Sequence, residues 1–287
     1  MLRNFTSLCF CLAVPLHSLQ VSRIYSPCRS SLLVASMSTT PSSDSLASSP
    51  SSNSNGDGDT ITILGFGSLL SEKSSRMTFP ELRNFRLGRL PNYRRVFGHP
   101  ADVFFQRGIA NFETKEMSSL SVEPCPGHEC VVSVFEVPSK DMMEDGIPSQ
   151  AFLEREAEFD IVPAAFFELD SESSKFSSQP KQGIVCKRSI DEAYLKRWGT
   201  KHFEENYGKY GVKTIWNWSE DSGLRPCAVY LRHCYLAAKG MGEECFRSFL
   251  DETYLVDRKT TVREYLKEHP EVLETQPPPA LAERYGG

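Results

Sequence analysis

The chain has 287 residues, of which 40% are hydrophobic and 24% are charged, which is typical of an ordinary globular protein. Its formal net charge is −5 and its basic residues alternate with acidic ones, which argues against a protein that binds nucleic acid. No apolar run reaches the roughly 18 residues of a membrane-spanning helix, so the sequence predicts no membrane segment.

The N-terminal segment has a composition of its own. Residues 1–43 contain no Asp or Glu, three arginines and many Ser and Thr residues, which is typical of an organellar transit peptide. The high serine content favours a plastid (chloroplast), with the mitochondrion or the cytoplasm as alternatives. The apolar residues 5–16 leave a secretory signal open as well. Residues 38–59 are Ser-rich and of low complexity, which predicts disorder.

We therefore expect three parts in the chain. Residues 1–58 form a transit peptide and a disordered Ser-rich linker, residues 59–272 form one folded domain, and residues 273–287 form a disordered tail. The expected domain has no low-complexity break and no internal repeat. Its cysteines are scattered through apolar stretches, which indicates reduced thiols in a core and not a disulfide framework.

Expected strands dominate the first half of the folded part and expected helices the second half. β-branched and apolar residues predict strands at 60–64, 85–97, 118–125, 129–137, 161–169 and 182–189. Helix-forming residues predict a helix at 149–159 and a mostly helical chain after Asp191. Thr260 or Thr261 with Glu264 forms the capping signature of one such helix. This order is typical of an α+β fold, with helices packed outside a mostly antiparallel sheet or small barrel.

The segment 60–71, TITILGFGSLLS, is the first candidate for a functional loop. Two glycines one residue apart, directly after a strand, indicate a backbone that side chains would obstruct. A dinucleotide-binding fingerprint needs a third Gly where Leu70 stands, and the residues around Ser68 do not match a nucleophile elbow. What is left is a loop whose free N–H groups can hold a carboxylate or a developing oxyanion. A tight turn without a ligand is the alternative.

The glutamates of FLEREAEF are the second candidate. Glu154 and Glu158 are four residues apart and share one helix face, whereas Glu156 lies on the face of Phe152 and Phe159. We expect a carboxyl group on such an apolar face to lie in a pocket, where burial favours its neutral form and suits proton transfer. The alternative is a solvated acidic helix surface.

Together the two segments resemble the γ-glutamyl cyclotransferase-like superfamily, whose members carry a Tyr-Gly-Ser-Leu type of loop after the first strand and one catalytic glutamate after a central strand. Arg155-Glu156 looks like the Arg-Glu pair of the ChaC-type branch, which degrades glutathione, and REYL at 263–266 looks like a C-terminal motif of that branch. The plant AIG2-like proteins are the most similar, since GSLLSEKS, FLERE, YLRHC and DRKTT followed by REYL occur in this order. The resemblance covers residues 60 to 270 approximately.

The resemblance implies a small mixed β-barrel or sheet with surrounding helices and a helical C-terminal part. It implies an enzyme of glutathione metabolism, classed as a transferase or lyase. The implied reaction cleaves a γ-glutamyl amide and releases 5-oxoproline, and it needs no metal or cofactor. By position it implies that Glu156 is the general acid and base. It also implies that the glutamyl group is bound by Gly65, Phe66, Gly67, Ser68 and Leu69. Phe66 stands where the family usually has Tyr, so a hydroxyl group is missing beside the loop.

Several alternatives stay open at this point. Glu158 is a rival for the catalytic carboxyl group. The same fold can serve as a binding or regulatory module without turnover, in which case Glu156 is paired with an arginine such as Arg155. An acyl or aminoacyl transferase can use the same loop and carboxyl group. In each case we expect a small-molecule partner, with a γ-glutamyl compound as the leading one, and neither nucleic acid nor a membrane.

The cluster CPGHEC at 125–130 is a possible metal site by composition alone. No second pair of Cys or His residues follows it at the spacing of a zinc site, so the sequence favours a polar turn between two strands.

Overall fold

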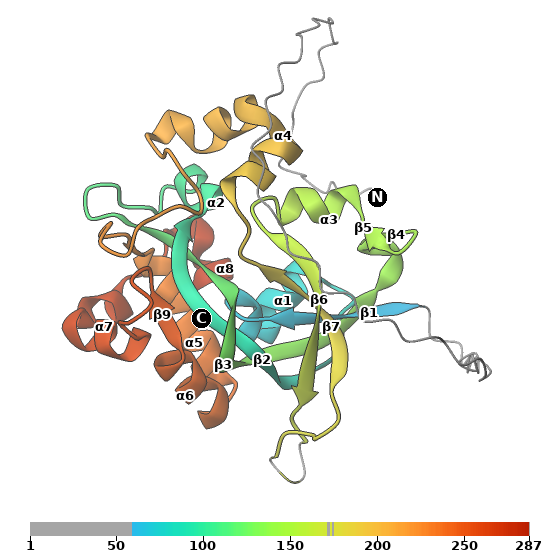
Figure 1. Ribbon diagram of the computed structural model, residues 1–287. Helices are drawn as coiled ribbons and strands as arrows, with labels where there is room; N and C mark the ends of the chain where they lie inside the picture. Colours follow the sequence, from blue (N-terminus) through green and yellow to red (C-terminus); the bar gives the residue numbers. More distant parts are fainter. Residues whose placement is uncertain (1–58, 171–172, 174, 287) are drawn as a thin grey trace, which may run out of the picture. The chain divides into compact units, whose positions relative to one another are not determined.

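The computed structural model describes residues 59–170, 173 and 175–286 of the chain (Figure 1). The transit peptide and linker expected at 1–58 lie outside these residues. The described residues belong to one structural unit. Long strands fill its first half and most of its helices follow residue 190, so the α+β class predicted from the sequence is confirmed.

Five strands close into a small barrel. They are β1 (Thr60–Gly65), β2 (Arg83–Pro100), β3 (Glu116–Pro138), β6 (Asp160–Glu168) and β7 (Lys181–Lys187). They pair in the order β3–β1–β7–β6–β2, and β2 pairs with β3 again, which closes the ring. The β1–β7 pair is parallel and the other four pairs are antiparallel, so the barrel is mixed. This confirms the expected mixed barrel.

Four short strands complete the described sheets. They are β4 (Met143–Glu144), β5 (Ile147–Pro148), β8 (Arg225–Pro226) and β9 (Thr253–Leu255). β8 extends the large sheet at β3 and β9 extends it at β2, whereas β4 and β5 form a hairpin of their own.

The long strands β2 and β3 differ from the prediction in one place. The predicted strands at 118–125 and 129–137 are joined into the single strand β3. The residues at 125–128 bulge out of the ladder opposite Asn92, whose φ of 61° is left-handed. The predicted polar turn in CPGHEC is therefore a bulge within one strand, because both flanks keep pairing with β2.

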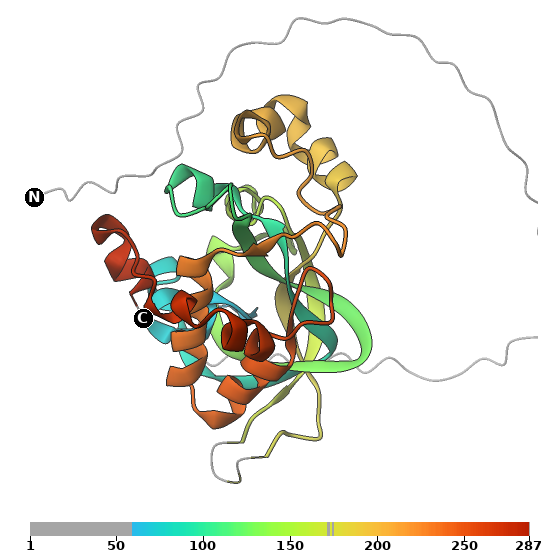
Figure 2. The same ribbon diagram turned by 90° about the vertical axis from the view of Figure 1, so that its left-hand side faces the viewer.

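Helices pack outside the barrel. The described residues include α1 (Glu72–Thr78), α2 (Asp102–Gln106), α3 (Gln150–Arg155), α4 (Asp191–Asn206), α5 (Ala228–Gly240), α6 (Glu243–Asp251), α7 (Val262–Glu268) and α8 (Ala282–Tyr285). In both views α5, α6 and α7 gather beside β2 and β3 (Figures 1 and 2). Their apolar side chains, such as Leu231 and Phe249, share one core cluster with Phe97 and Leu120 of the barrel. Among all the residues that the structure describes, no helix is long and apolar enough to cross a membrane.

Two helix predictions have different outcomes. The capping box of Thr261 and Glu264 is present at the start of α7. The helix predicted at 149–159 is too long, because α3 ends at Arg155. Glu156 leaves the helical conformation with φ −109° and ψ 40°, and its carbonyl accepts the N–H of Phe159 in a turn that leads into β6. The candidate glutamates therefore lie at the end of the helix and in this turn, not on two faces of one helix.

The disordered tail expected at 273–287 is not what the structure shows for residues 273–286. This segment contains the end of the 3₁₀ helix η4 (Pro270–Glu274), η5 (Pro279–Leu281) and α8. Tyr285 is only 3% exposed, and its ring packs edge-on against His233 of α5 at 5.5 Å between centroids. The Pro-rich composition predicts disorder because it has no apolar periodicity, but one buried aromatic ring anchors the segment.

Candidate active site

A pocket of about 330 Å³ lies at the end of β1. Its walls come from the turn after β1, α1, the segment around α2, the end of α3 and the turn after it, β3, β7, α5 and α8. Both sequence candidates meet here, because residues 66–69 and Glu156 line the same pocket. A wider hollow of about 800 Å³ at the start of β1, near Glu81 and Lys140, contains none of the predicted site residues.

Gly65 has a different place from the one expected. It ends β1 and does not line the pocket. A Cβ atom at this position would meet the Ser133 hydroxyl at 2.4 Å and the Leu69 Cβ at 2.6 Å. Ser133 in turn donates a hydrogen bond to the carbonyl of Leu69 at 2.7 Å. Gly65 therefore allows the turn to pack on β3, and the expected role in binding the substrate directly does not fit its position.

Gly67 lies at the pocket and permits a close contact. A Cβ atom here would approach the Tyr230 hydroxyl to 2.5 Å, so this position has no room for a larger residue unless Tyr230 moves. The Tyr230 hydroxyl lies in the same pocket as Ser68, whose N–H opposes the rise that burial causes in the pKa of Tyr230. It thus supplies a hydroxyl group beside the loop, where Phe66 has none.

The turn also has unused donors. Ser68 to Leu70 form one 3₁₀ turn, closed by a hydrogen bond from the N–H of Leu70 to the carbonyl of Gly67 at 2.9 Å. Within the described residues, the N–H groups of Gly67 and Leu69 donate to no acceptor. Two free donors in a pocket-lining turn are what a carboxylate or an oxyanion needs.

Glu156 lies at the pocket with its side chain 22% exposed. Burial raises the pKa of Glu156, while Arg155, the Cys186 thiol and Arg284 oppose this effect. The Nε of Arg155 is 3.4 Å from Oε1, and the Cys186 thiol lines the same pocket and helps to lower the pKa of Glu156. The group is therefore neither free of cations nor held in a short ion pair.

Glu158 lines the same pocket and has no such partner. In the described part of the chain no cation lies within ion-pair distance of its carboxyl group. Burial, together with the charges of Asp102 and Glu156, raises the pKa of Glu158 to about 8. Glu158 therefore carries a proton at neutral pH, whereas Glu156 has neighbours that favour its ionised form.

Asp102 is a pocket residue that the sequence analysis missed. It begins α2, accepts a hydrogen bond from Gln106 at 3.0 Å, and its pKa is raised by burial. Asp102, Glu156 and Glu158 thus bring three carboxyl groups into one pocket, where like charges favour shared protons. Nothing in the sequence around Asp102 distinguishes it from an ordinary first-turn aspartate.

Three arginines balance these carboxyl groups in number. Arg155 lies over the Phe79 ring at 4.4 Å and beside Glu156. Arg107 donates a hydrogen bond to the Tyr285 hydroxyl at 2.8 Å. Arg284, the third arginine, lines the pocket from α8. A pocket with both cations and carboxyl groups suits a zwitterionic ligand. The sequence analysis missed Arg107 and Arg284, the latter because its segment was expected to be disordered.

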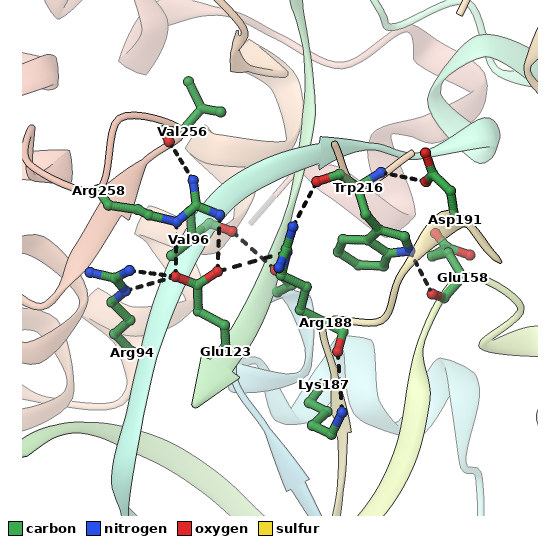
Figure 3. Close-up of polar contacts among 11 residues, drawn as sticks. Arg94, Val96, Glu123, Glu158, Lys187, Arg188, Asp191, Trp216, Val256 and Arg258 are labelled. Atoms are coloured by element: carbon green, nitrogen blue, oxygen red, sulfur yellow. Dashed lines mark hydrogen bonds and ion pairs between the residues drawn. The ribbon is translucent and has the colours of Figure 1, made fainter. Parts of the chain in front are cut away.

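Trp216 holds the turn that carries Glu158 (Figure 3). Its indole N–H donates to the carbonyl of Glu158 at 3.1 Å, and its backbone N–H donates to Asp191 at 2.8 Å. Its own carbonyl accepts from Arg188 at 2.8 Å. The indole is 1% exposed and stacks on His99 with 4.2 Å between centroids. The backbone of Glu158 is therefore fixed by a buried aromatic ring that is itself held by Asp191 and Arg188.

No protein-family model matches the sequence, and no curated protein matches it. A solved structure described as a γ-glutamyl cyclotransferase is 11% identical over 64% of this chain and 81% of its own, with a TM-score of 0.38. A yeast γ-glutamyl cyclotransferase specific to glutathione is 12% identical over 76% of this chain and 96% of its own, with a TM-score of 0.39. A protein of Arabidopsis thaliana is 13% identical over 54% and 91%, with a TM-score of 0.28. These low scores assign neither an activity nor a substrate to this chain.

Proposed function

We propose that this chain is a γ-glutamyl cyclotransferase-like enzyme, which cleaves a γ-glutamyl amide by intramolecular cyclisation to 5-oxoproline. Glutathione, a γ-glutamyl peptide or a γ-glutamyl amine is the substrate class. One observation carries the proposal: a turn with two free N–H groups and carboxyl groups with raised pKa values line the same pocket.

The reaction asks little of the protein because the substrate supplies its own nucleophile. The α-amine attacks the γ-carbonyl carbon and forms the new C–N bond of the ring, and the bond from that carbon to the leaving amine breaks. Because nucleophile and carbonyl belong to one molecule, much of the entropic barrier is already removed. The α-ammonium nitrogen loses two protons as it becomes the N–H of the ring, and the leaving nitrogen gains two and departs as an ammonium group. A single carboxyl group can take each proton as base and deliver it as acid.

The pocket offers a residue for each of these tasks. We assign the proton transfers to Glu156, because Arg155 and the Cys186 thiol favour the ionised form that a base requires. The free N–H groups of Gly67 and Leu69 would stabilise the oxyanion of the tetrahedral intermediate. Glu158, neutral at pH 7, would act as a hydrogen-bond donor that does not compete for the substrate ammonium group.

A binding module without turnover is the second candidate, and the contact of Glu156 with Arg155 favours it. Two facts weaken this alternative. The distance of 3.4 Å is longer than the roughly 2.7–2.9 Å of a charge-assisted hydrogen bond. The pKa of Glu156 is also raised by burial in spite of the guanidinium, whereas a firm structural ion pair would hold it down.

The test uses the full-length chain with glutathione and a panel of γ-glutamyl peptides and amines, and follows 5-oxoproline by mass spectrometry. Glu156→Gln is the test variant. Glu154→Gln is the matched control, because Glu154 lies two residues earlier in α3, is exposed and does not line the pocket. We expect 5-oxoproline from the parent and the control at similar rates, and from Glu156→Gln at a rate at least about 10²-fold lower.

Other outcomes identify other functions. If no compound of the panel turns over but one binds and shifts the melting temperature, the binding module replaces the enzyme. If the glutamyl group appears on an added acceptor amine and not as 5-oxoproline, the chain is an acyl transferase that uses the same pocket.

A further inference from the structure

The C-terminal helix α8 forms one wall of the pocket. Arg284 and Tyr285 line it together with Arg107, which follows α2 about 180 residues earlier in the chain. Because α8 contacts α5 and Tyr285 is buried, this wall is part of the folded unit.

A single aromatic ring orders both guanidinium groups. The Tyr285 hydroxyl accepts a hydrogen bond from Nη1 of Arg107 at 2.8 Å, and the Arg107 guanidinium lies 5.6 Å from the ring centroid. The guanidinium of Arg284 lies 5.9 Å from the same centroid. The ring is itself held by His233 on its edge. Two cations are therefore held near one another without losing all of their donors.

Neither guanidinium group has an anionic partner. In the described part of the chain, no carboxylate lies within ion-pair distance of Arg107 or Arg284, whereas Arg155 in the same pocket contacts Glu156. Other arginines, such as Arg94 of β2 and Arg258 after β9, are paired with Glu123 at 2.7 and 3.0 Å. Two half-buried, unpaired guanidiniums in a pocket are a fitting site for a carboxylate, which accepts two hydrogen bonds in parallel.

We propose that Arg107 and Arg284 form a carboxylate-binding subsite, which takes the α-carboxylate of the γ-glutamyl group. This inference rests on the proposed function. The α-carboxylate and the α-ammonium group share one carbon atom, so the subsite must lie beside the proposed base. Arg284 meets this condition, because it lines the same pocket as Glu156, and its charge favours the ionised form of that carboxyl group. The C-terminal helix then selects substrates with a free α-carboxylate.

The test compares two ligand pairs on the full-length chain. The first pair is a γ-glutamyl amide with a free α-carboxylate and the same compound with an α-carboxamide, compared by kcat and KM. The second pair is 5-oxoproline and 5-oxoprolinamide, compared by equilibrium binding in a calorimeter, which needs no turnover. The variants are Arg284→Gln, Arg107→Gln and Arg284→Lys. Glu283→Gln is the control, because Glu283 is the exposed neighbour and does not line the pocket.

We expect the parent and the control to prefer the carboxylate of each pair by roughly 10- to 100-fold, which is the effect of a hydrogen-bonded charge. Arg284→Gln and Arg107→Gln should remove most of this preference through KM, with kcat changed less, and Arg284→Lys should restore part of it. Arg→Gln variants that keep the full preference in both pairs overturn the subsite. So does a parent that prefers neither carboxylate.

The two claims can fail separately. If the parent makes 5-oxoproline and the preference survives in both Arg→Gln variants, the enzyme stands and the subsite falls. If no γ-glutamyl compound turns over but the parent binds 5-oxoproline better than its amide in an Arg284-dependent manner, the subsite stands and the cyclotransferase proposal falls.

Discussion

Glu123 and Glu158 lie on opposite sides of Trp216 and have opposite surroundings (Figure 3). Glu123 on β3 is 7% exposed and is paired with Arg258 in two contacts of 3.0 Å and with Arg94 at 2.7 Å, while Arg188 lies at 3.8 Å. Glu158 has no cation at such a distance among the described residues and shares its pocket with Asp102 and Glu156.

The pKa values of the two groups separate accordingly. Burial by itself would raise both pKa values, but the Arg258 and Arg94 guanidiniums hold the pKa of Glu123 below its ordinary value. Burial without such partners raises the pKa of Glu158 to about 8. The difference teaches that partners, and not burial alone, decide whether a carboxyl group stabilises the fold or remains available for proton chemistry.

The largest expected effect separates Glu156 from Glu158 within the pocket. Glu156→Gln should lower the rate of 5-oxoproline formation by about 10²- to 10⁴-fold, because it removes the general base. Glu158→Gln should stay within about tenfold of the parent at pH 7, because an amide resembles the neutral carboxyl group that Glu158 already is at that pH. Initial rates measured by mass spectrometry check this. The reverse order of the two variants would make Glu158 the catalytic residue.

The next effect concerns stability on the other side of Trp216. Glu123→Gln should lower the free energy of unfolding by about 2–4 kcal/mol, because it leaves three guanidiniums facing one another. The loss should stay below that for a fully buried pair, since the Arg94, Arg188 and Arg258 side chains are 21%, 31% and 20% exposed. Urea unfolding measures it. The folded variant should keep its 5-oxoproline activity, and a loss comparable to that of Glu156→Gln would contradict the separation of roles.

The comparison of Glu123 and Glu158 also predicts that the free energy of unfolding changes with pH in two separate ranges. The lowered pKa of Glu123 stabilises the fold above its ordinary value of 4.5, and this contribution is lost as the pH falls through the folded-state pKa. The raised pKa of Glu158 acts in the opposite sense: the folded chain keeps a proton that the unfolded chain has released, so stability falls as the pH rises from 4.5 to about 8.

Unfolding at a series of pH values separates these two ranges. Glu123→Gln should flatten the pH dependence of stability below pH 4.5, and Glu158→Gln should flatten it between 4.5 and 8, by an amount on the order of 1–2 kcal/mol between the ends of that range. A Glu158→Gln profile parallel to that of the parent over this range would show that Glu158 is ionised in the fold.

The smallest effect concerns the link between the two regions. Arg188 donates a hydrogen bond to the carbonyl of Trp216 and lies 3.8 Å from the Glu123 carboxylate. Arg188→Gln should therefore lower the free energy of unfolding by about 0.5–1.5 kcal/mol. Because Trp216 keeps its hydrogen bonds to Asp191 and Glu158, the rate of 5-oxoproline formation should change less than threefold, which initial-rate assays of the variant would check. A larger rate effect would mean that the arginine cluster controls the position of Glu158.

The strands of the barrel could be predicted from the sequence, because the residue patterns that mark a strand are local. β-branched alternation in 60–64 and 129–137 marks strands that the structure contains, and Gly65 and Gly67 mark a turn at the end of β1 that packs closely on its neighbours. The error at 149–159 is also local: strong helix formers continue to Glu158, but the entry into β6 at Asp160 requires a turn first. The transit peptide at 1–58 stays a prediction.

Three charged residues of the pocket could not be predicted from the sequence. Asp102, Arg107 and Arg284 become pocket residues only because barrel closure and the burial of Tyr285 bring together segments about 180 residues apart. No periodicity or spacing in a single sequence carries that information. Glu156 was found for a partly wrong reason, since it lies after the helix and not on its apolar face.

The most direct test of the central claim is the identity of the product formed by the full-length chain from glutathione or another γ-glutamyl amide in ¹⁸O-labelled water. Intramolecular cyclisation predicts 5-oxoproline without ¹⁸O and one free amine for each ring formed. Glutamate that carries ¹⁸O would show that water is the nucleophile and would contradict the account, as would a panel of γ-glutamyl amides from which no amine is released.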